Sequence, residues 1–270
     1  MVVQHNLSAM NTNRQLSGVT SSLSKATEKL SSGYKINRAG DDAAGLSISE
    51  KMRSQIRGLN KASDNAQDGI SLIQTAEGAM NEAHTILQRM NELATQAAND
   101  TNTTADRNAI QDEMNQLTSE IDRISCTTQF NTQNLLDGNF TKKSLQVGSL
   151  ANQSIGISIS SLSASALKVN ALSVTSFSKA GDAMTKIQAA IESVSKQRSE
   201  LGALQNRLEH TINNLDTTSE NTQAAESRIR DTDIAETMVD YSKNNILSQA
   251  GQSMLAQANQ STQGALSLLG

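Results

Sequence analysis

The chain has 270 residues, contains no proline and carries a net charge of −4, with three phenylalanines, two tyrosines and no tryptophan. The absence of proline favours long uninterrupted helices, and so few aromatic rings supply little for a thick globular core or for stacking on sugars or bases. The acidic balance argues against a binder of phosphate backbones, so no nucleic-acid partner is expected.

The single cysteine, Cys126, has no second cysteine to pair with and no neighbouring histidine cluster to form a zinc site. We interpret it as a small apolar packing residue next to Ile124. No apolar run approaches the roughly 20 residues that cross a bilayer, and residues 1–15 lack the basic and apolar parts of a signal peptide. These features predict no metal, no cofactor and no membrane insertion, and by themselves they favour a cytosolic protein.

Apolar residues near the N-terminus recur at alternating spacings of three and four, which places them along one side of a helix. They are Leu16, Val19, Leu23, Ala26 and Leu30. The following segment, residues 31–45, contains three glycines and predicts a break between helices. Asp41 and Asp42 are placed to cap the next helix.

The next apolar stripe begins at Ile48 and predicts one helix from Asp42 to Asn99, about 87 Å long at 1.5 Å per residue. Helices of this length are typical of coiled coils and assemblies, since the average globular helix has only about 11 to 12 residues. A shorter helix follows, with apolar residues at Ile110, Met114, Leu117, Ile121 and Ile124.

The middle of the chain, residues 130–178, is rich in Ser, Asn and Gly and predicts a small β-hairpin from alternating segments at 145–147 and 155–159. The helical stripe resumes near Lys179, with apolar residues seven apart at Ile187, Val194, Leu201, Leu208 and Leu215. A final stripe reaches the last residues through Leu247, Ala250, Met254, Ala258, Ala265 and Leu268.

The predicted fold is mainly α, with long antiparallel coiled-coil-like helices from both chain ends and a small β-hairpin region in the middle. The few stripe residues of the first helix cannot offset the entropy of ordering a two-helix pair, so we infer that the terminal helices order only when many copies pack together. No pair of nucleophile and base, metal-ligand set or cofactor loop is recognisable, so we expect no enzyme activity.

Several segments at both ends of the chain resemble bacterial flagellin. The most specific are Asn6–Met10, Leu30–Asn37, Asp41–Leu46, Ser227–Asp231 and Leu255–Gln260. The resemblance covers essentially the whole chain except part of residues 137–180, in register at both ends, and it indicates a short form without large outer domains.

The resemblance implies a structural subunit that self-assembles into the flagellar filament for motility. Residues 1–42 and 228–270 would form an inner coiled-coil domain that orders on assembly, and residues 43–227 a rod domain with a β-containing segment at about 137–178. Filament-core packing is then expected from the two terminal stripes, namely Leu16, Val19, Leu23, Ala26, Leu30, Leu247, Ala250, Met254, Ala258, Ala265 and Leu268.

The resemblance also implies partners and a location. Export would proceed unfolded through the flagellar type III apparatus to an extracellular filament, with an export chaperone contacting Ile246, Leu247, Met254 and Leu255. Filament cap and hook-associated proteins are further expected partners. Toll-like receptor 5 would bind Arg89, Leu93 and Glu113, and the spacing of four between Arg89 and Leu93 predicts a protruding charged and apolar pair on one helix face.

Two other classes of protein share parts of this pattern. A hook–filament junction protein has the same terminal plan but would be expected to stop filament growth. A helical signalling or adaptor protein would stay soluble at high concentration and keep both termini ordered.

Overall fold

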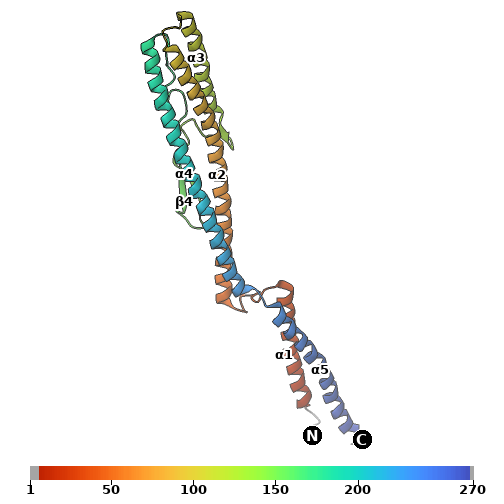
Figure 1. The fold of residues 1–270 in the computed structure, drawn as a ribbon. Coiled ribbons are helices and arrows are strands. Elements are labelled where there is room, and N and C mark those ends of the chain that lie inside the picture. The colour runs from red at the N-terminus through yellow and green to blue at the C-terminus, as the bar shows by residue number, and fades with distance from the viewer. Residues whose placement is uncertain (1–5, 268–270) are drawn as a thin grey trace. The chain divides into compact units, whose positions relative to one another are not determined.

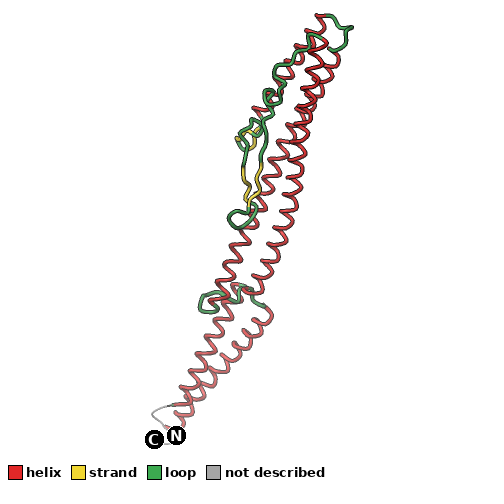
Figure 2. Tube along the Cα trace, turned by 90° about the vertical axis from the view of Figure 1, so that its left-hand side faces the viewer, coloured by secondary structure: helices red, strands yellow, loops and turns green. Residues whose placement is uncertain are grey.

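The computed structural model describes the backbone of residues 6–267 and the side chains of residues 6–261. The described chain contains the helices α1 (Leu7–Ser32), α2 (Ala43–Ala97), α3 (Thr104–Thr127), α4 (Phe177–Arg230) and α5 (Ile234–Ser267). Between α3 and α4 lie four short strands, β1 (Gln129–Phe130), β2 (Gln133–Asn134), β3 (Lys143–Gln146) and β4 (Ser154–Ile157) (Figures 1 and 2). The predicted mainly α fold with a small strand region in the middle is confirmed.

The chain forms two compact units. Unit 1 comprises the residues up to Ser54 together with those from Asn221 onward, and unit 2 comprises Gln55–Glu220. The boundaries between the units lie inside α2 and α4, whereas the sequence placed its domain boundaries at 42 and 228, near helix ends. The assignment of an inner and a rod layer to the two parts stays a prediction.

Local hydrogen bonds explain where the helices begin and end. The side chain of Asp42 accepts a hydrogen bond from the backbone N–H of Gly45 at 2.9 Å, so Asp42 caps α2 as the sequence predicts. Thr103 and Asp106 form a reciprocal capping box at the start of α3. Helix α1 ends at Gly33, which adopts a left-handed conformation with φ of 75°, and glycine takes this conformation without steric cost.

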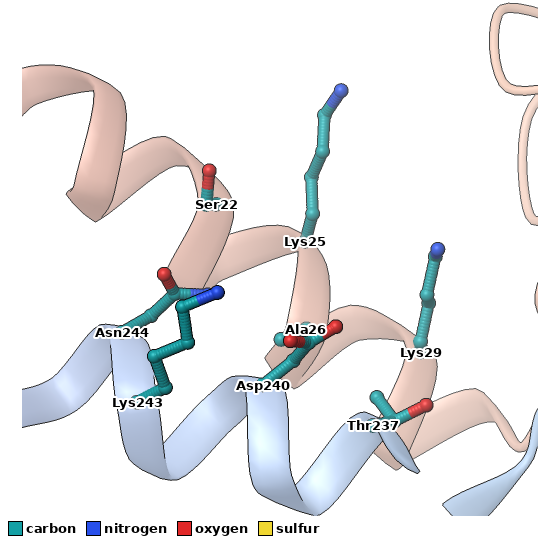
Figure 3. Close-up of a pocket in the computed structure, with 8 residues that line it drawn as sticks. All are labelled: Ser22, Lys25, Ala26, Lys29, Thr237, Asp240, Lys243 and Asn244. Carbon is teal, nitrogen blue, oxygen red and sulfur yellow. The ribbon is translucent and has the colours of Figure 1, made fainter.

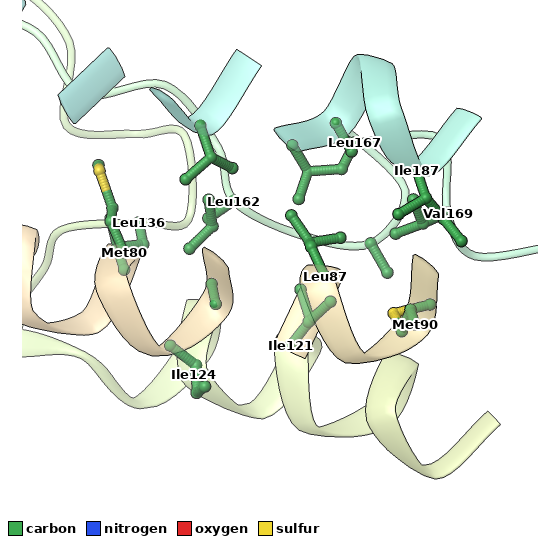
Figure 4. Packing of buried hydrophobic residues seen from close by; sticks show 14 of the residues in the cluster. Met80, Leu87, Met90, Ile121, Ile124, Leu136, Leu162, Leu167, Val169 and Ile187 are labelled. Carbon is green, nitrogen blue, oxygen red and sulfur yellow. The ribbon is translucent and has the colours of Figure 1, made fainter. Parts of the chain in front are cut away.

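Unit 2 has a continuous hydrophobic core to which α2, α3 and α4 all contribute. Met80, Leu87 and Met90 of α2 pack with Ile121 of α3 and Ile187 of α4 (Figure 4). The apolar residues that recur every seven positions in α4 are all buried, at most 6% exposed: Ile187, Val194, Leu201, Leu208 and Leu215. The stripe therefore predicts the core of this unit correctly.

Ile48 departs from the predicted stripe of α2, because its side chain is 46% exposed. It lies in the part of α2 that belongs to unit 1, before the first buried apolar residue of the helix, Leu59. A periodic pattern identifies a helix face but not what covers it, and within this chain little covers the start of this face.

Polar side chains on the stripes join α2 to α4. The Ser63 hydroxyl donates to Asp216 at 3.1 Å, and the Ser219 hydroxyl donates to Asn60 at 2.7 Å. Farther along the same helices, Glu77 and Arg198 form an ion pair at 3.6 Å. Because each bond requires one particular alignment of the two helices, these residues favour one register.

Strands β3 and β4 form the predicted hairpin, an antiparallel pair that aligns Lys143 with Ile157 and Leu145 with Ile155. In β4 the isoleucines are buried in the core while Ser154 and Gly156 are exposed. The hairpin lies close against α2, because a Cβ atom on Gly69 would collide with the side chain of Leu145.

Cys126 is exposed, so its interpretation as a packing residue is wrong. Ile124 and Ser125 are buried on the inner side of α3. Cys126 is two positions beyond Ile124, a rotation of about 200° around the helix axis, and therefore faces outward.

Candidate functional site

Helices α1 and α5 lie side by side and antiparallel in unit 1 (Figures 1 and 2). Near the start of α1 the amide of Asn6 donates to the carbonyl oxygen of Ala258 at 2.9 Å. At Gly251 an added Cβ atom would lie 3.1 Å from the Leu16 Cδ1 atom. The side chain of Leu16 in α1 therefore packs closely over this glycine of α5.

This helix pair buries very few of its own side chains. In α1 only Ala26 is buried, and among the side chains described in α5 only Thr237 is. Leu16, Val19 and Leu23 are half-buried. Unit 2 by contrast has a large core of fully buried side chains, so the pair depends far less on interior packing than the rest of the chain.

Large apolar side chains are exposed along this pair and along the start of α2. They are Leu7, Met10, Ile48, Ile234, Met238, Val239, Ile246, Leu247 and Met254, from 44% to 69% exposed. In unit 2, the large apolar side chains that are exposed among the described residues are Leu150 and Phe177. A concentration of exposed apolar side chains is typical of interaction surfaces. We refer to these nine side chains as the apolar surface of unit 1.

The structure brings together several residues of the two predicted terminal stripes. Leu16 and Val19 of α1 line a shallow groove of about 240 Å³ with Leu247, Ala250 and Met254 of α5. Leu30 and Ala258 are half-buried elsewhere along the pair. The Ala265 side chain and the whole of Leu268 lie outside the described residues. Within one chain the α1 stripe thus faces α5, while Leu247 and Met254 remain largely exposed.

Contacts between distant segments of unit 1 tie the α1–α2 loop to the end of α4. The backbone N–H of Lys35 donates to the Arg230 carbonyl at 2.7 Å, and the N–H of Thr232 donates to the Gly33 carbonyl at 3.0 Å. The Arg230 guanidinium lies 4.8 Å from the centre of the Tyr34 ring and forms an ion pair with Glu50 at 2.6 Å. Sequence reasoning missed this cation–π contact, although both residues belong to segments quoted for the resemblance.

Arg89 of α2 lies at the surface of unit 2, with its side chain 50% exposed. Its Nε atom donates to Glu113 of α3 at 3.0 Å, and its Nη1 atom donates to Glu92 at 3.1 Å. The bond to Glu113 and then that to Glu92 raise the pKa of the Arg89 guanidinium above its ordinary value. The structure therefore places two of the three predicted receptor-binding residues, Arg89 and Glu113, in direct contact.

Leu93 does not protrude beside Arg89, so that part of the prediction is wrong. Its side chain is 2% exposed and belongs to the core of unit 2. Leu93 is three residues after Met90 and four before Ala97, both of which are fully buried, and this spacing places it on the inner face of the helix. Arg89 is one position before Met90, a rotation of about 100° around the helix axis, so its side chain lies away from the core. At the surface it pairs with Glu113.

The described residues contain no cluster of three or more His, Cys, Asp or Glu side chains placed to hold a metal ion. Among the helices of the described chain, none combines the length and the apolar character that a membrane span needs.

A packed helical unit joined to a terminal helix pair with an apolar surface defines a structural subunit that binds other protein surfaces. Residues 3–141 match the family model of the bacterial flagellin N-terminal helical region, and residues 184–269 match that of the C-terminal helical region. The chain therefore belongs to the bacterial flagellin family and is a structural subunit of a flagellar filament, which confirms the resemblance seen in the sequence.

Individual relatives agree with this assignment. The chain is 55% identical to a flagellin of Halalkalibacterium halodurans over 271 residues and 52% identical to a flagellin of Bacillus subtilis strain 168 over 304 residues, with complete coverage of both chains in each case. A crystal structure of Bacillus cereus flagellin is similar with a TM-score of 0.50 and 31% identity, covering 60% of this chain and 94% of that chain.

Proposed function

We propose that this chain assembles with further copies of itself by burying the apolar surface of unit 1, and that α1 and α5 form the inner packing layer of the filament. The exposure of Ile246, Val239, Met10 and their neighbours is the observation that carries the proposal. Soluble chains seldom leave so many large apolar side chains together in water, and contact with neighbouring copies would remove them from it.

Under the same proposal, α1 and α5 become ordered helices only when the chain assembles with other copies. Ordering a residue costs about 1.5 kcal/mol of conformational entropy, and α1 offers only one buried side chain, Ala26, to offset that cost. Neighbouring copies would add buried area along both helices and shift the equilibrium toward the ordered pair. Leu16, Val19, Leu23 and Leu30, which are half-buried in one chain, would then become fully buried.

Export of the chain in an unfolded state to an extracellular filament is part of the proposed function. A helix pair with few buried side chains is easy to unfold for export, and a chain without proline avoids slow prolyl isomerisation when it folds again.

An export chaperone would cover the exposed face of α5 before assembly. Ile246, Leu247 and Met254 are 67%, 44% and 60% exposed, and Leu255 is half-buried beside them. An apolar face of this kind fits a groove of a binding partner. Filament cap and hook-associated proteins would meet the same helices at the two ends of the filament.

Seeded polymerisation of the purified chain, followed by electron microscopy, tests the assembly proposal. Filament fragments should elongate when monomer of this chain is added to them. A hook–filament junction protein would attach to the fragments and stop their growth, and an adaptor protein would leave them unchanged, so either result would overturn the proposal.

Recognition by Toll-like receptor 5 is a second proposed function, and the exposed pair of Arg89 and Glu113 supports it. Leu93 would act only by holding the helix in place, since its side chain is buried. A reporter-cell assay should show weaker signalling for Arg89→Ala than for wild type. Arg123→Ala is the matched control, because Arg123 is also exposed and ion-paired, with Glu120 of the same helix. Equal signalling by the two variants would refute the assignment.

A further inference from the structure

A second groove of unit 1 lies between α1 and α5 and is polar (Figure 3). Its volume is about 340 Å³, and it is lined by Ser22, Lys25, Ala26 and Lys29 of α1 and by Thr237, Asp240, Lys243 and Asn244 of α5. Ala26 and Thr237 are buried between the helices. We call this groove the basic groove.

Three ammonium groups and one carboxylate line the basic groove, so its charge is positive. Lys25, Lys29 and Lys243 form no ion pair within the described part of the chain, and Lys25 and Lys29 extend from α1 away from α5 in Figure 3. The positive charges of Lys25 and Lys29 also favour the ionised form of the Asp41 carboxyl group. Hydrogen bonds from the backbone of Arg38 and Asn37 lower the pKa of Asp41, and Lys25 and Lys29 lower it further.

Unit 1 also contains an acidic segment that lacks ion-pair partners among the described residues. It consists of Asp231, Asp233 and Glu236, at and just before the start of α5. Asp233 accepts hydrogen bonds from the N–H groups of Ala235 and Glu236, which caps the helix but leaves the negative charge in place. We call residues 231–236 the acidic turn.

The basic groove and the acidic turn are among the last charged features before the two chain ends. No charged residue follows Lys243, and the only Asp, Glu, Lys or Arg before Lys25 is Arg14. Apolar contacts alone tolerate sliding of one helix along another, whereas paired charges fix one alignment. A charged band at this position could therefore set the register between neighbouring copies.

We propose that the basic groove binds the acidic turn of a second copy of this chain and so sets the register between neighbouring subunits. Glu236 and Lys243 are seven residues apart in α5, about 10 Å along the helix axis. A neighbour displaced by about that distance brings its acidic turn against the groove. A contact between two different patches also propagates from copy to copy, which is the requirement for an open helical polymer. This inference rests on the proposed assembly.

Charge reversal with compensation tests the contact in seeded polymerisation of the full chain. The groove variant carries Lys25→Glu and Lys29→Glu. The turn variant carries Asp233→Asn and Glu236→Lys, in which asparagine retains a side-chain oxygen that can cap α5. The control variant carries Lys35→Glu and Lys51→Glu, two exposed lysines of unit 1 outside the groove.

The critical concentration for filament growth is expected to rise about tenfold in each reversed variant, because attraction becomes repulsion. The variant that combines both reversals should return to within about threefold of wild type, and the control should stay near wild type. An equimolar mixture of the groove and turn variants should also assemble better than either alone, because each supplies the charge that the other lacks.

Three results would overturn the proposal. The first is normal growth of either reversed variant, and the second is a control that is as defective as the groove variant. The third is loss of growth that the combined variant does not recover. If that loss appears in sodium phosphate but not in sodium chloride of equal ionic strength, the groove binds a free anion instead. Failure of the wild type itself to grow would instead contradict the proposed assembly, so the two failures are distinguishable.

Discussion

Truncation of Ile246 to alanine separates assembly from folding of the single chain. The Ile246 side chain is 67% exposed on α5, and full burial of an isoleucine stabilises a protein by up to about 3 kcal/mol. About 2 kcal/mol of this stabilisation is therefore gained only when a neighbouring copy covers the exposed part of the side chain. This free energy corresponds to about a 30-fold rise in the critical concentration of the Ile246→Ala variant.

The assay is seeded growth at a series of monomer concentrations, read by sedimentation and electron microscopy. The matched control is Leu150→Ala, because Leu150 is also 67% exposed but lies in unit 2, near the hairpin. We expect the control to grow with a nearly unchanged critical concentration and both monomers to unfold at the same urea concentration. Equal growth of the two variants would refute the assignment of assembly to the apolar surface of unit 1.

Three further predictions concern the fold. Leu208 is fully buried in unit 2, so Leu208→Ala should lower the monomer's free energy of unfolding by about 2 to 5 kcal/mol and Leu208→Met by less than about 1.5 kcal/mol. Urea titrations followed by circular dichroism measure both losses, and equal losses would contradict this packing. Hydrogen bonds from the side chain and backbone of Thr103 lower the pKa of Asp106 below 3.8, so the cap stabilises the fold above that pH and loses this contribution as the pH falls through the folded pKa. An NMR titration should give a higher Asp106 pKa in Thr103→Ala, and an unchanged value would refute the cap. Gly33 has a φ of 75°, which disfavours alanine, whereas Gly18 lies in open space within α1, where alanine is favoured. Each change is worth about 1 kcal/mol, so the critical concentration should rise about fivefold in Gly33→Ala and fall in Gly18→Ala, and a change of the same sign in both would contradict this.

Periodicity predicted the helices well because their stripes are long and regular. In α4 the recurrence from Ile187 to Leu215 identifies buried side chains without error, since a core-facing helix must repeat its apolar residues on one face. Asp42 likewise identifies the start of α2, because a side-chain acceptor is needed there.

The errors arose where one spacing was considered without its neighbours. Arg89 and Leu93 are four apart, but Leu93 also continues the buried series through Met90 and Ala97. The second spacing decides its orientation, because a helix packs its apolar face inward. Cys126 shows the same error, since its position relative to Ile124 already places it on the outer side of α3.

Contacts between distant segments could not be predicted from local pattern. Tyr34 follows α1 and Arg230 ends α4, so the two residues are far apart in the sequence and meet only in the folded unit 1. The basic groove has the same origin, because Lys25 and Lys243 come from opposite ends of the chain. Composition indicates the charges of these residues, but only the antiparallel pairing determines which of them share a surface.

Hydrogen–deuterium exchange on monomer and filament tests most directly whether α1 and α5 depend on neighbouring copies. In the monomer, amides of α2, α3 and α4 within unit 2 should exchange slowly, while amides of residues 7–32 and 234–267 should exchange nearly as fast as in an unfolded chain. In the filament the terminal helices should become strongly protected. Slow exchange of both terminal helices in the isolated monomer would contradict the account.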